Sequence, residues 1–242
     1  MNLKEELNLA IEAARKAGEY LRDLKLKDIE VLSNLDNDIK LDVDKKAEGI
    51  ILNQLKDSIH GILSEESGNV RESKTGLKWV IDPLDGSLNF FKGLPQNVVS
   101  IGLFKDLKPI AGVVYDYNQD EMYTGIVGSG AWLNGQNIKV SDISPADKSI
   151  MAIGFPSKLE ITEEHLLDFV KKIQTYKKIR YFGSAALSLV YVASGKLEAY
   201  TQEGIKFWDF AGGLAIAVAA GAKTKIEKLG GDNNFKIEVF NI

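Results

Sequence analysis

The sequence contains no cysteine and only two histidines among its 242 residues. Without cysteine the chain has no disulfide, no thiolate metal site and no cysteine nucleophile. The two histidines, His60 and His165, are too few for a histidine-rich metal centre and disfavour a Ser-His-Asp triad. Any metal site must therefore use oxygen ligands. The lack of cysteine is compatible with a reducing, cytoplasmic location, which we expect for this chain.

Long apolar runs and an excess of one charge are also missing. The most apolar stretch, residues 210–222, is shorter than the roughly 18–20 residues that span a bilayer. The first residues, MNLKEELNLA, carry acids from the start and do not resemble a signal peptide. With 30 basic and 34 acidic residues the net charge is −4, which gives no reason to expect nucleic acid or an anionic membrane as partner.

The apolar residues that are present follow helix and strand periods. Apolar side chains three and four residues apart predict a helix near the N-terminus and another over residues 44–55, whereas the polar stretch SNLDNDIKLD between them predicts a loop. The β-rich runs over residues 98–127 predict an antiparallel meander, and the Asn134-Gly135 pair after it predicts a hairpin.

From about Ser144 onward strand-like and helical segments alternate. Helices are predicted over residues 163–174 and 185–193, and a third opens at Trp208. The chain is therefore expected to hold an α+β half, residues 1–145, and an α/β half, residues 146–242, in one compact unit.

Acidic residues stand at the ends of several apolar segments. Asp44 and Asp209 each have a structural interpretation as a helix cap, and the Glu65-Glu66 pair as solvated acids at a strand end. The stretch WVIDPLDGSLNF is harder to explain, because an apolar strand runs directly into Asp82 and Asp85. Ionised carboxylates are costly to bury unless a positive partner neutralises them.

The turn DPLDGS allows two interpretations. It is either a structural acidic turn or a site where two carboxylates and a backbone carbonyl face a hard divalent cation such as Mg²⁺. The backbone N–H groups of the residues after Asp85 are then placed to bind an anion. A site with acidic side chains for a metal ion beside backbone amides for an anion is suited to a phosphate ester.

The motifs resemble those of the inositol monophosphatase family, which includes archaeal-type fructose-1,6-bisphosphatases. The resemblance rests on DPLDGSLNF (82–90), SEES (64–67), WDFAGG (208–213) and GSAAL (183–187), in the family's order and spacing. It covers nearly the whole chain and implies a layered αβαβα sandwich, usually as a homodimer. It also implies Mg²⁺-dependent hydrolysis with two or three ions, and inhibition by Li⁺.

The resemblance further implies individual roles. Three residues would serve catalysis, with Glu65 and Ser87 holding the attacking water and Asp44 touching a looser third ion. The two main ions would be held by Glu65, Asp82, the Leu84 carbonyl, Asp85 and Asp209. The substrate would be contacted by Asp85, Gly86, Ser87, Leu88, Arg180, Gly183, Ser184, Ala185, Gln202 and Lys206.

Some positions depart from the family pattern. Ser64 replaces a usual glycine, and Ser87 replaces a frequent threonine while keeping the hydroxyl. The family's inositol-contacting glutamate corresponds to Gln202 or, if the alignment shifts by one residue, to Glu203. Lys206 stands where animal enzymes carry histidine. A lysine there would favour a second phosphate on the substrate.

The expected function is release of phosphate from inositol-1-phosphate, fructose-1,6-bisphosphate or both. One alternative is a phosphatase for 3′-phosphoadenosine 5′-phosphate or another nucleotide. A second is a catalytically weak regulatory or binding member, which predicts damaged metal ligands. Its metal-ligand acids Glu65, Asp82, Asp85 and Asp209, with Ser87, are all present. The expected partner is a small phosphorylated polyol or sugar.

Overall fold

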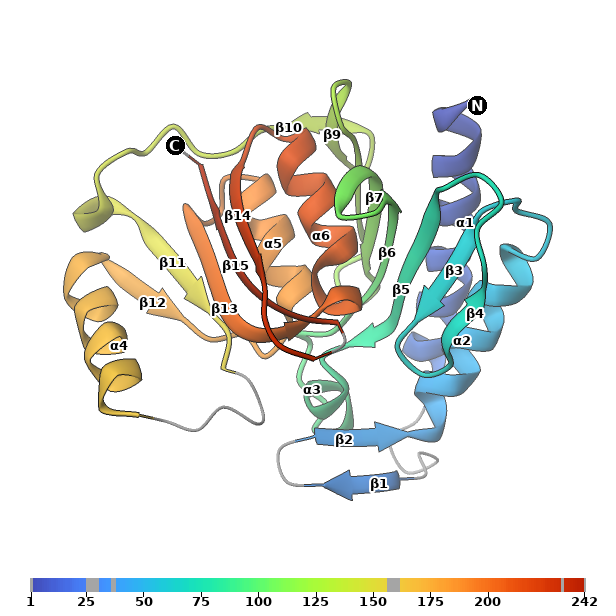
Figure 1. The fold of residues 1–242 in the computed structure, drawn as a ribbon, viewed down its shortest axis with the longest axis horizontal. Helices are drawn as coiled ribbons and strands as arrows, with labels where there is room; N and C mark the ends of the chain where they lie inside the picture. The colour runs from blue at the N-terminus through green and yellow to red at the C-terminus, as the bar shows by residue number, and fades with distance from the viewer. Residues whose placement is uncertain (1, 25–30, 36–37, 156–161, 232, 242) are drawn as a thin grey trace.

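The computed structural model describes residues 2–24, 31–35, 38–155, 162–231 and 233–241. They form five layers in the order helix, sheet, helix, sheet, helix (Figure 1). The helices are α1 (Leu3–Asp23), α2 (Asp42–Gln54), α3 (Ser87–Phe91), α4 (Glu163–Thr175), α5 (Ala185–Ala193), α6 (Phe207–Ala219) and the short 3-10 helix η2 (Ala146–Lys148). This arrangement confirms the layered sandwich that the motifs imply. Among the described residues no helix is long and apolar enough to span a membrane.

The larger sheet has eight strands in the order β10-β9-β8-β7-β6-β5-β3-β4. Its strands are β3 (Gly61–Ser64), β4 (Gly68–Arg71), β5 (Lys78–Asp85), β6 (Val98–Lys105), β7 (Lys108–Asp116), β8 (Glu121–Ile126), β9 (Gly130–Leu133) and β10 (Gln136–Ile138). Strands β5 to β10 pair antiparallel as a meander, as predicted. The predicted hairpin joins β9 and β10, where Asn134 and Gly135 both adopt positive φ.

Strand β5 is central in this sheet and is covered on both faces. Trp79 and Ile81 pack in the core shared with α1 and α2, whereas Val80 between them packs in the core shared with α5 and α6. Because side chains alternate along a strand, only a strand between two helix layers needs apolar residues at successive positions. This explains the uninterrupted apolar run that leads to Asp82.

Helix α6 lies unusually close to the larger sheet. Gly102, Gly112 and Gly125 are neighbours across β6, β7 and β8. A Cβ at Gly112 would lie 2.4 Å from the Gly212 carbonyl oxygen, and one at Gly102 would lie 2.8 Å from the Ala211 carbonyl carbon. This row of glycines therefore lets the α6 backbone sit against the strands, and it fixes where the acidic first turn of α6 falls.

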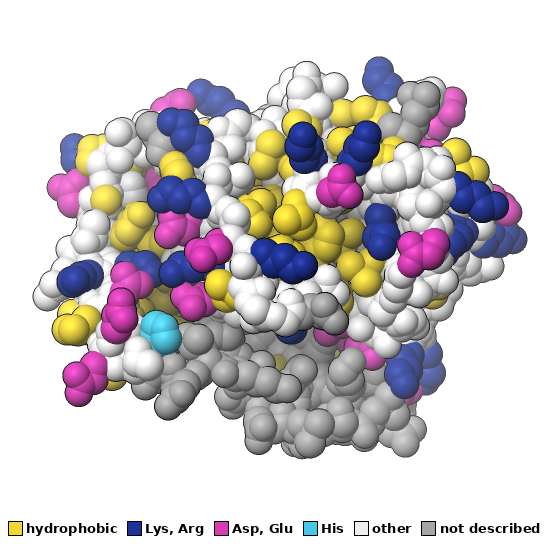
Figure 2. Space-filling model, in the orientation of Figure 1, with side chains coloured by type: hydrophobic (Ala, Val, Ile, Leu, Met, Phe, Trp, Pro, Cys, Tyr) yellow, Lys and Arg dark blue, Asp and Glu magenta, His cyan; other side chains and the backbone are white. Residues whose placement is uncertain are grey.

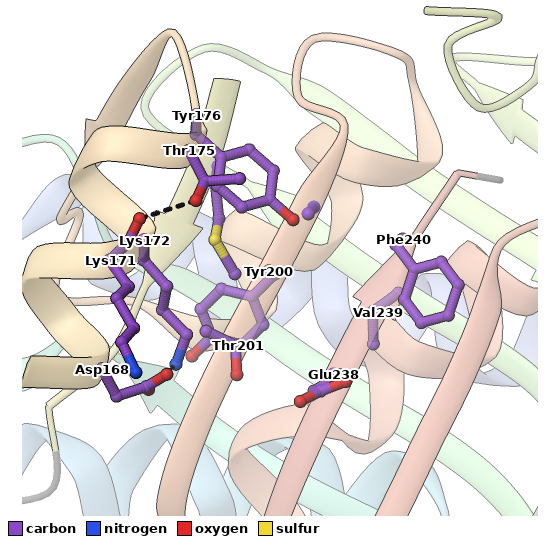
Figure 3. A pocket seen from close by; sticks show the side chains of 12 residues that line it. Asp168, Lys171, Lys172, Thr175, Tyr176, Tyr200, Thr201, Glu238, Val239 and Phe240 are labelled. Atoms are coloured by element: carbon purple, nitrogen blue, oxygen red, sulfur yellow. Dashed lines mark hydrogen bonds and ion pairs between the residues drawn. The ribbon is translucent and has the colours of Figure 1, made fainter. Parts of the chain in front are cut away.

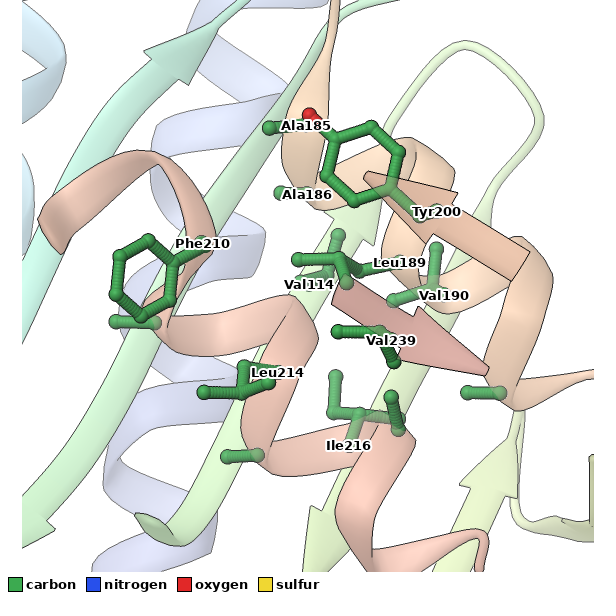
Figure 4. Packing of buried hydrophobic residues seen from close by; sticks show 14 of the residues in the cluster. Val114, Ala185, Ala186, Leu189, Val190, Tyr200, Phe210, Leu214, Ile216 and Val239 are labelled. Carbon is green, nitrogen blue, oxygen red and sulfur yellow. The ribbon is translucent and has the colours of Figure 1, made fainter. Parts of the chain in front are cut away.

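The smaller sheet has five strands in the order β12-β11-β13-β15-β14, and α5 and α6 lie between it and the larger sheet. Its strands are β11 (Ile150–Ile153), β12 (Lys178–Arg180), β13 (Ala199–Lys206), β14 (Lys223–Lys228) and β15 (Asn234–Phe240). Figure 4 shows the packing between these layers, with Leu189 of α5, Leu214 of α6 and Val239 of β15 buried together. The division of the chain at residues 145–146 stays a prediction.

Two sequence expectations need correction. The stretch predicted as a loop contains a two-stranded antiparallel pair, β1 (Val31–Leu35) and β2 (Asp38–Leu41). Backbone hydrogen bonds join two such strands whatever their side chains are. Asn and Asp are uncommon in strands, so their presence in this stretch misled the prediction. Asp44 and Asp209 do not precede their helices but lie in the first turns of α2 and α6, where Asp209 still caps α6 by accepting the Lys206 N–H.

The surface carries acidic and basic side chains interspersed. In the face shown in Figure 2 the two signs alternate around a central apolar area, and no large patch of a single sign is visible. This agrees with the near balance of charges in the sequence. Such a face gives no electrostatic reason for a nucleic-acid partner.

Candidate active site

Three carboxylates meet at the carboxyl ends of two parallel neighbours, β3 and β5. Glu65 follows directly after β3, and its N–H donates to the Ile81 carbonyl at 3.1 Å. Asp82 and Asp85 close β5, where a register shift between them interrupts the pairing with β6. We call Glu65, Asp82 and Asp85 the acid floor. Asp82 and Asp85 are almost fully buried, and Glu65 is half-buried.

Asp85 is held by the first turn of α5. Its Oδ2 accepts hydrogen bonds from the Ser184 hydroxyl at 2.6 Å and from the Ala186 N–H at 2.7 Å, and its Oδ1 accepts from the Ala185 N–H at 3.3 Å. A helix N-terminus favours a negative charge because its N–H groups are unpaired within the helix. The motif GSAAL, in the C-terminal half of the chain, thus fixes the carboxylate of Asp85 in the N-terminal half.

Ser87 connects the acid floor to α2. Its hydroxyl lies 3.1 Å from Asp44 Oδ1 and 3.0 Å from the Leu84 carbonyl oxygen, within donating distance of both. The Leu84 N–H in turn donates to Asp82 Oδ1 at 3.0 Å. Gly86 permits this turn because its φ is 95°, and a Cβ there would meet the Gln96 carbonyl oxygen at 2.7 Å. The predicted residues Asp44, Leu84 and Ser87 therefore do come together.

Asp209 comes from the C-terminal half of the chain. It lies in the first turn of α6 and accepts a hydrogen bond from the Lys206 N–H at 2.9 Å. Its negative charge raises the pKa of both Glu65 and Asp82. The close approach of α6 to the sheet thus brings a fourth carboxylate to the acid floor.

The surroundings of the acid floor raise the pKa of its carboxyl groups. Burial is the main cause that raises the pKa of Glu65 and of Asp82, and the neighbouring carboxylates add to it in both cases. Burial also raises the pKa of Asp85 from 3.8 to about 6, although hydrogen bonds from Ser184 and the α5 backbone oppose the rise. Buried acids that repel one another are stabilised by a cation among them.

The donor set fits a hard divalent cation. It consists of carboxylate oxygens and one backbone carbonyl, which are the ligands that Mg²⁺ and similar ions prefer. The described residues contain no group of three or more Asp, Glu, His or Cys side chains in a ready-made metal cage. The fit therefore rests on the chemistry of the acid floor and on its raised pKa values.

A pocket opens beside Asp85 and Asp209. Ser184, Ala185 and Gly183 line it, as the motifs predicted, and so does Gln202. Glu203 does not line this pocket and instead pairs with Lys236 at 3.1 Å. Of these two residues, Gln202 is therefore the one that lines the pocket beside Asp85.

Several predicted substrate contacts lie elsewhere. Arg180 is exposed, and its Nη1 donates to the neighbouring Ile179 carbonyl at 3.0 Å. Neither Arg180 nor Lys206 lines the pocket with Asp85. The side chain of Leu88 is exposed, but its predicted contact is the backbone N–H, which lies next to Ser87 in the first turn of α3. A separate pocket between α4 and the smaller sheet contains Asp168, Lys172 and Glu238 but no predicted site residue (Figure 3).

Two residues that support the site carried no predicted role. Glu48 is buried one turn after Asp44, and its carboxylate accepts from the Ser67 N–H at 3.1 Å and the Ser67 hydroxyl at 2.5 Å. It thereby ties the segment that carries Glu65 to α2. Asn89, within the quoted motif, donates from Nδ2 to the carbonyls of Gln96 and Phe182 at 2.7 and 2.8 Å. Their sequence signals were an acid four residues after Asp44 and an asparagine inside DPLDGSLNF.

Comparisons with known proteins agree with this geometry. The model of the inositol monophosphatase family matches residues 2–228. Nus factor SuhB of Escherichia coli strain K12 is 38% identical over 220 residues, which cover 89% of this chain and 82% of that protein.

Solved structures resemble the chain over nearly its whole length. The extragenic suppressor protein suhB from Bartonella henselae has a TM-score of 0.89 at 33% identity, covering 98% of this chain and 94% of that one. Inositol monophosphatase from Anabaena (Nostoc) sp. PCC 7120 has a TM-score of 0.86 at 34% identity, covering 100% and 92%. A solved inositol monophosphatase–fructose 1,6 bisphosphatase has a TM-score of 0.77 at 29% identity, covering 100% and 96%. The chain belongs to the inositol monophosphatase family, a family of metal-dependent phosphatases, and is itself a phosphatase.

Proposed function

We propose that the protein is a Mg²⁺-dependent phosphomonoesterase that releases inorganic phosphate from inositol-1-phosphate, fructose-1,6-bisphosphate or both. The observation that carries the proposal is the acid floor, whose buried carboxylates raise one another's pKa beside the Ser87 hydroxyl. The names of two solved relatives, an inositol monophosphatase and an inositol monophosphatase–fructose 1,6 bisphosphatase, support this choice of substrates.

In this proposal Mg²⁺ would be held by Glu65, Asp82, Asp85, Asp209 and the Leu84 carbonyl, and would supply positive charge for the phosphate and lower the pKa of water. Glu65 and the Ser87 hydroxyl orient the attacking water, and Asp44 fixes that hydroxyl through the 3.1 Å contact. The backbone N–H groups of Gly86, Ser87 and Leu88 bind the phosphate oxygens. No histidine base is needed.

The pocket beyond Asp85 receives the alcohol part of the substrate. Gln202, Ser184 and Ala185 line it and would orient the leaving oxygen. Arg180 and Lys206 lie outside this pocket, so the structure provides little support for the second phosphate that Lys206 was expected to bind. Of the two proposed substrates, this favours the monophosphate, inositol-1-phosphate.

The relatives named Nus factor raise the alternative of a regulatory member. That alternative predicts loss of the acids, whereas all of them are present and converge. A Nus-factor role would therefore accompany catalysis in this chain. A homodimer, a cytoplasmic location, inhibition by Li⁺ and a nucleotide as substrate remain predictions from the sequence.

Phosphate release by the purified protein tests the proposal. Inositol-1-phosphate and fructose-1,6-bisphosphate are offered separately with Mg²⁺ and with EDTA. Release that requires Mg²⁺ for either ester supports the proposal, and the ratio of kcat/KM ranks the two. Absence of release from both, by folded protein at saturating Mg²⁺, would overturn it.

A further inference from the structure

A buried hydroxyl group without a partner lies beside the acid floor. Ser100 of β6 is fully buried, and its Oγ makes no hydrogen bond with any other described residue. An unpaired polar group in the core lowers the stability of the folded state, so such groups are few and each needs an explanation. For Ser100 the explanation lies in the residues that surround it.

The strand register places Ser100 next to Asp82. The two residues are direct partners across the antiparallel strands β5 and β6. Their side chains therefore lie on the same face of the sheet, with Cβ atoms about 5 Å apart. The partner of Ser100 on the other neighbouring strand, β7, is the apolar Val114. Within the sheet the polar side chain next to the hydroxyl is thus that of Asp82.

Helix α6 covers the same hydroxyl. A Cβ at Gly212 would lie 2.5 Å from Ser100 Oγ, so only a glycine at this position leaves room for the hydroxyl. Gly212 follows Asp209 by three residues on α6, and residues three apart lie on the same side of a helix. Ser100 is therefore enclosed between the strand that ends in the acid floor and the turn of α6 that carries Asp209.

The Asp82 carboxylate has acceptor positions for a further hydrogen bond. Its Oδ1 accepts from the Leu84 N–H at 3.0 Å, and the carboxyl groups of Asp82 and Glu65 share a hydrogen bond. A carboxylate offers about four acceptor positions on its two oxygens. A cation held by both acids replaces the hydrogen bond between them, which leaves an acceptor position on Asp82 for the Ser100 hydroxyl.

We infer that Ser100 is a positioning residue of the cation site, whose hydroxyl donates to the Asp82 carboxylate once Mg²⁺ is bound and holds that carboxylate toward the ion. The inference rests on the proposed function and deepens it. A hydroxyl bonded to an ionised carboxylate forms one of the stronger hydrogen bonds in proteins, and such partners of metal ligands contribute to metal affinity. Because the same hydroxyl lacks a partner in the metal-free fold, Ser100 stabilises the loaded site and not the empty one.

The test measures stability and cation binding separately. Ser100→Ala removes the unpaired hydroxyl, so its unfolding midpoint in EDTA should equal or exceed that of the wild-type protein. Calorimetric titration of Mg²⁺ into the metal-free variant should give a Kd about tenfold higher than the wild-type value. A serine that only fills space would show the reverse, with lower stability and unchanged affinity.

Ser64→Ala is the matched control. Ser64 is also fully buried, and its Oγ likewise has no partner among the described residues. It is paired with Ile81, whose side chain packs toward α1 and α2, whereas the Ser100 hydroxyl faces α6. Ser64→Ala should therefore match Ser100→Ala in EDTA and bind Mg²⁺ as tightly as the wild-type protein does.

Unchanged Mg²⁺ affinity in Ser100→Ala, or an equal loss of affinity in both variants, would overturn the inference. So would a midpoint in EDTA well below that of Ser64→Ala, because the hydroxyl would then have a partner in the metal-free protein. Mg²⁺-dependent phosphate release by the wild-type protein would in each case leave the proposed function standing. Absence of Mg²⁺ binding by the wild-type protein would count against the proposed function itself.

Discussion

The acid floor and two aromatic side chains, Phe155 and Tyr181, meet at the pocket that Asp85 lines but are built in opposite ways. We call Phe155 and Tyr181 the aromatic wall. The acid floor closes two neighbouring strands of the larger sheet and is largely buried, and hydrogen bonds from the first turn of α5 and from the Leu84 N–H hold Asp85 and Asp82. The aromatic wall follows β11 and β12 at one end of the smaller sheet and is exposed, and its rings contact each other and Phe169. We therefore expect substitutions in the acid floor to disturb the core, whereas Phe155 and Tyr181 can vary without unfolding it.

Asp82→Asn should have the largest effect. It removes one carboxylate from the acid floor and leaves the wall unchanged, so kcat/KM should fall about 100-fold or more on every substrate alike. The unfolding midpoint in EDTA should rise, because one buried negative charge is lost. Steady-state rates and thermal unfolding measure the two effects. Asp147→Asn, an exposed acid in η2, is the control. Unchanged phosphate release in Asp82→Asn would contradict the assignment.

The acid floor should also make metal-free stability depend on pH. The pKa of Asp85 is raised from 3.8 to about 6, so the folded state holds this proton more tightly than the unfolded state. Stability in EDTA should therefore be highest below pH 4 for this group and fall by up to about 3 kcal/mol as pH rises through about 6.

Urea unfolding at several pH values, with EDTA and with Mg²⁺, measures this difference. Mg²⁺ favours the ionised carboxylates, so the gap between the two curves should widen as pH rises from 4 to 7. A constant gap over that range would show that the cation does not act through these acids.

Gly112→Ala should break the placement of α6 without touching either the acid floor or the wall. Its Cβ would lie 2.4 Å from the Gly212 carbonyl oxygen, so α6 must shift or strain must remain. We expect a loss of about 1–3 kcal/mol in the free energy of unfolding, measured in urea. Gly128→Ala is an informative comparison, because open space surrounds that glycine and only its positive φ, unlike the backbone of Gly112, opposes a side chain. Its loss should come from the backbone alone and be smaller. A larger loss there than at Gly112 would refute the close-approach argument.

Glu48→Gln should give the smallest effect and act on the acid floor alone. The amide replaces one of the two acceptors that hold Ser67, so the segment carrying Glu65 loosens. The Mg²⁺ concentration needed for half-maximal activity should rise about tenfold. The ratio of the kcat/KM values for inositol-1-phosphate and fructose-1,6-bisphosphate should stay the same. Glu19→Gln, on an exposed position of α1, serves as the control.

The sequence was most informative where residues act through a fixed spacing. The alternation of helices and strands, the Asn134-Gly135 hairpin and the strand running into Asp82 all follow from local patterns. The convergence of Asp82 with Asp209 could not be predicted from periodicity, because a long-range packing feature, the glycine row under α6, produces it. The family resemblance provided that link instead.

Other features lay beyond any local pattern. Whether Gln202 or Glu203 faces the pocket depends on a register shift in β13 between Glu203 and Ile205, and on the ion pair with Lys236. The aromatic wall joins residues from two separate strands, so no single motif contains it. The pairing of β1 with β2 was missed because a hairpin backbone tolerates polar residues that are uncommon in strands.

Calorimetric titration of Mg²⁺ into the metal-free protein at neutral pH tests the central claim most directly. If the acid floor holds the cation, the wild-type protein should bind Mg²⁺ with release of protons, because the raised pKa values leave part of these carboxylates protonated. Asp82→Asn should bind about 100-fold more weakly and release fewer protons. Equal binding and equal proton release by the two proteins would contradict the account.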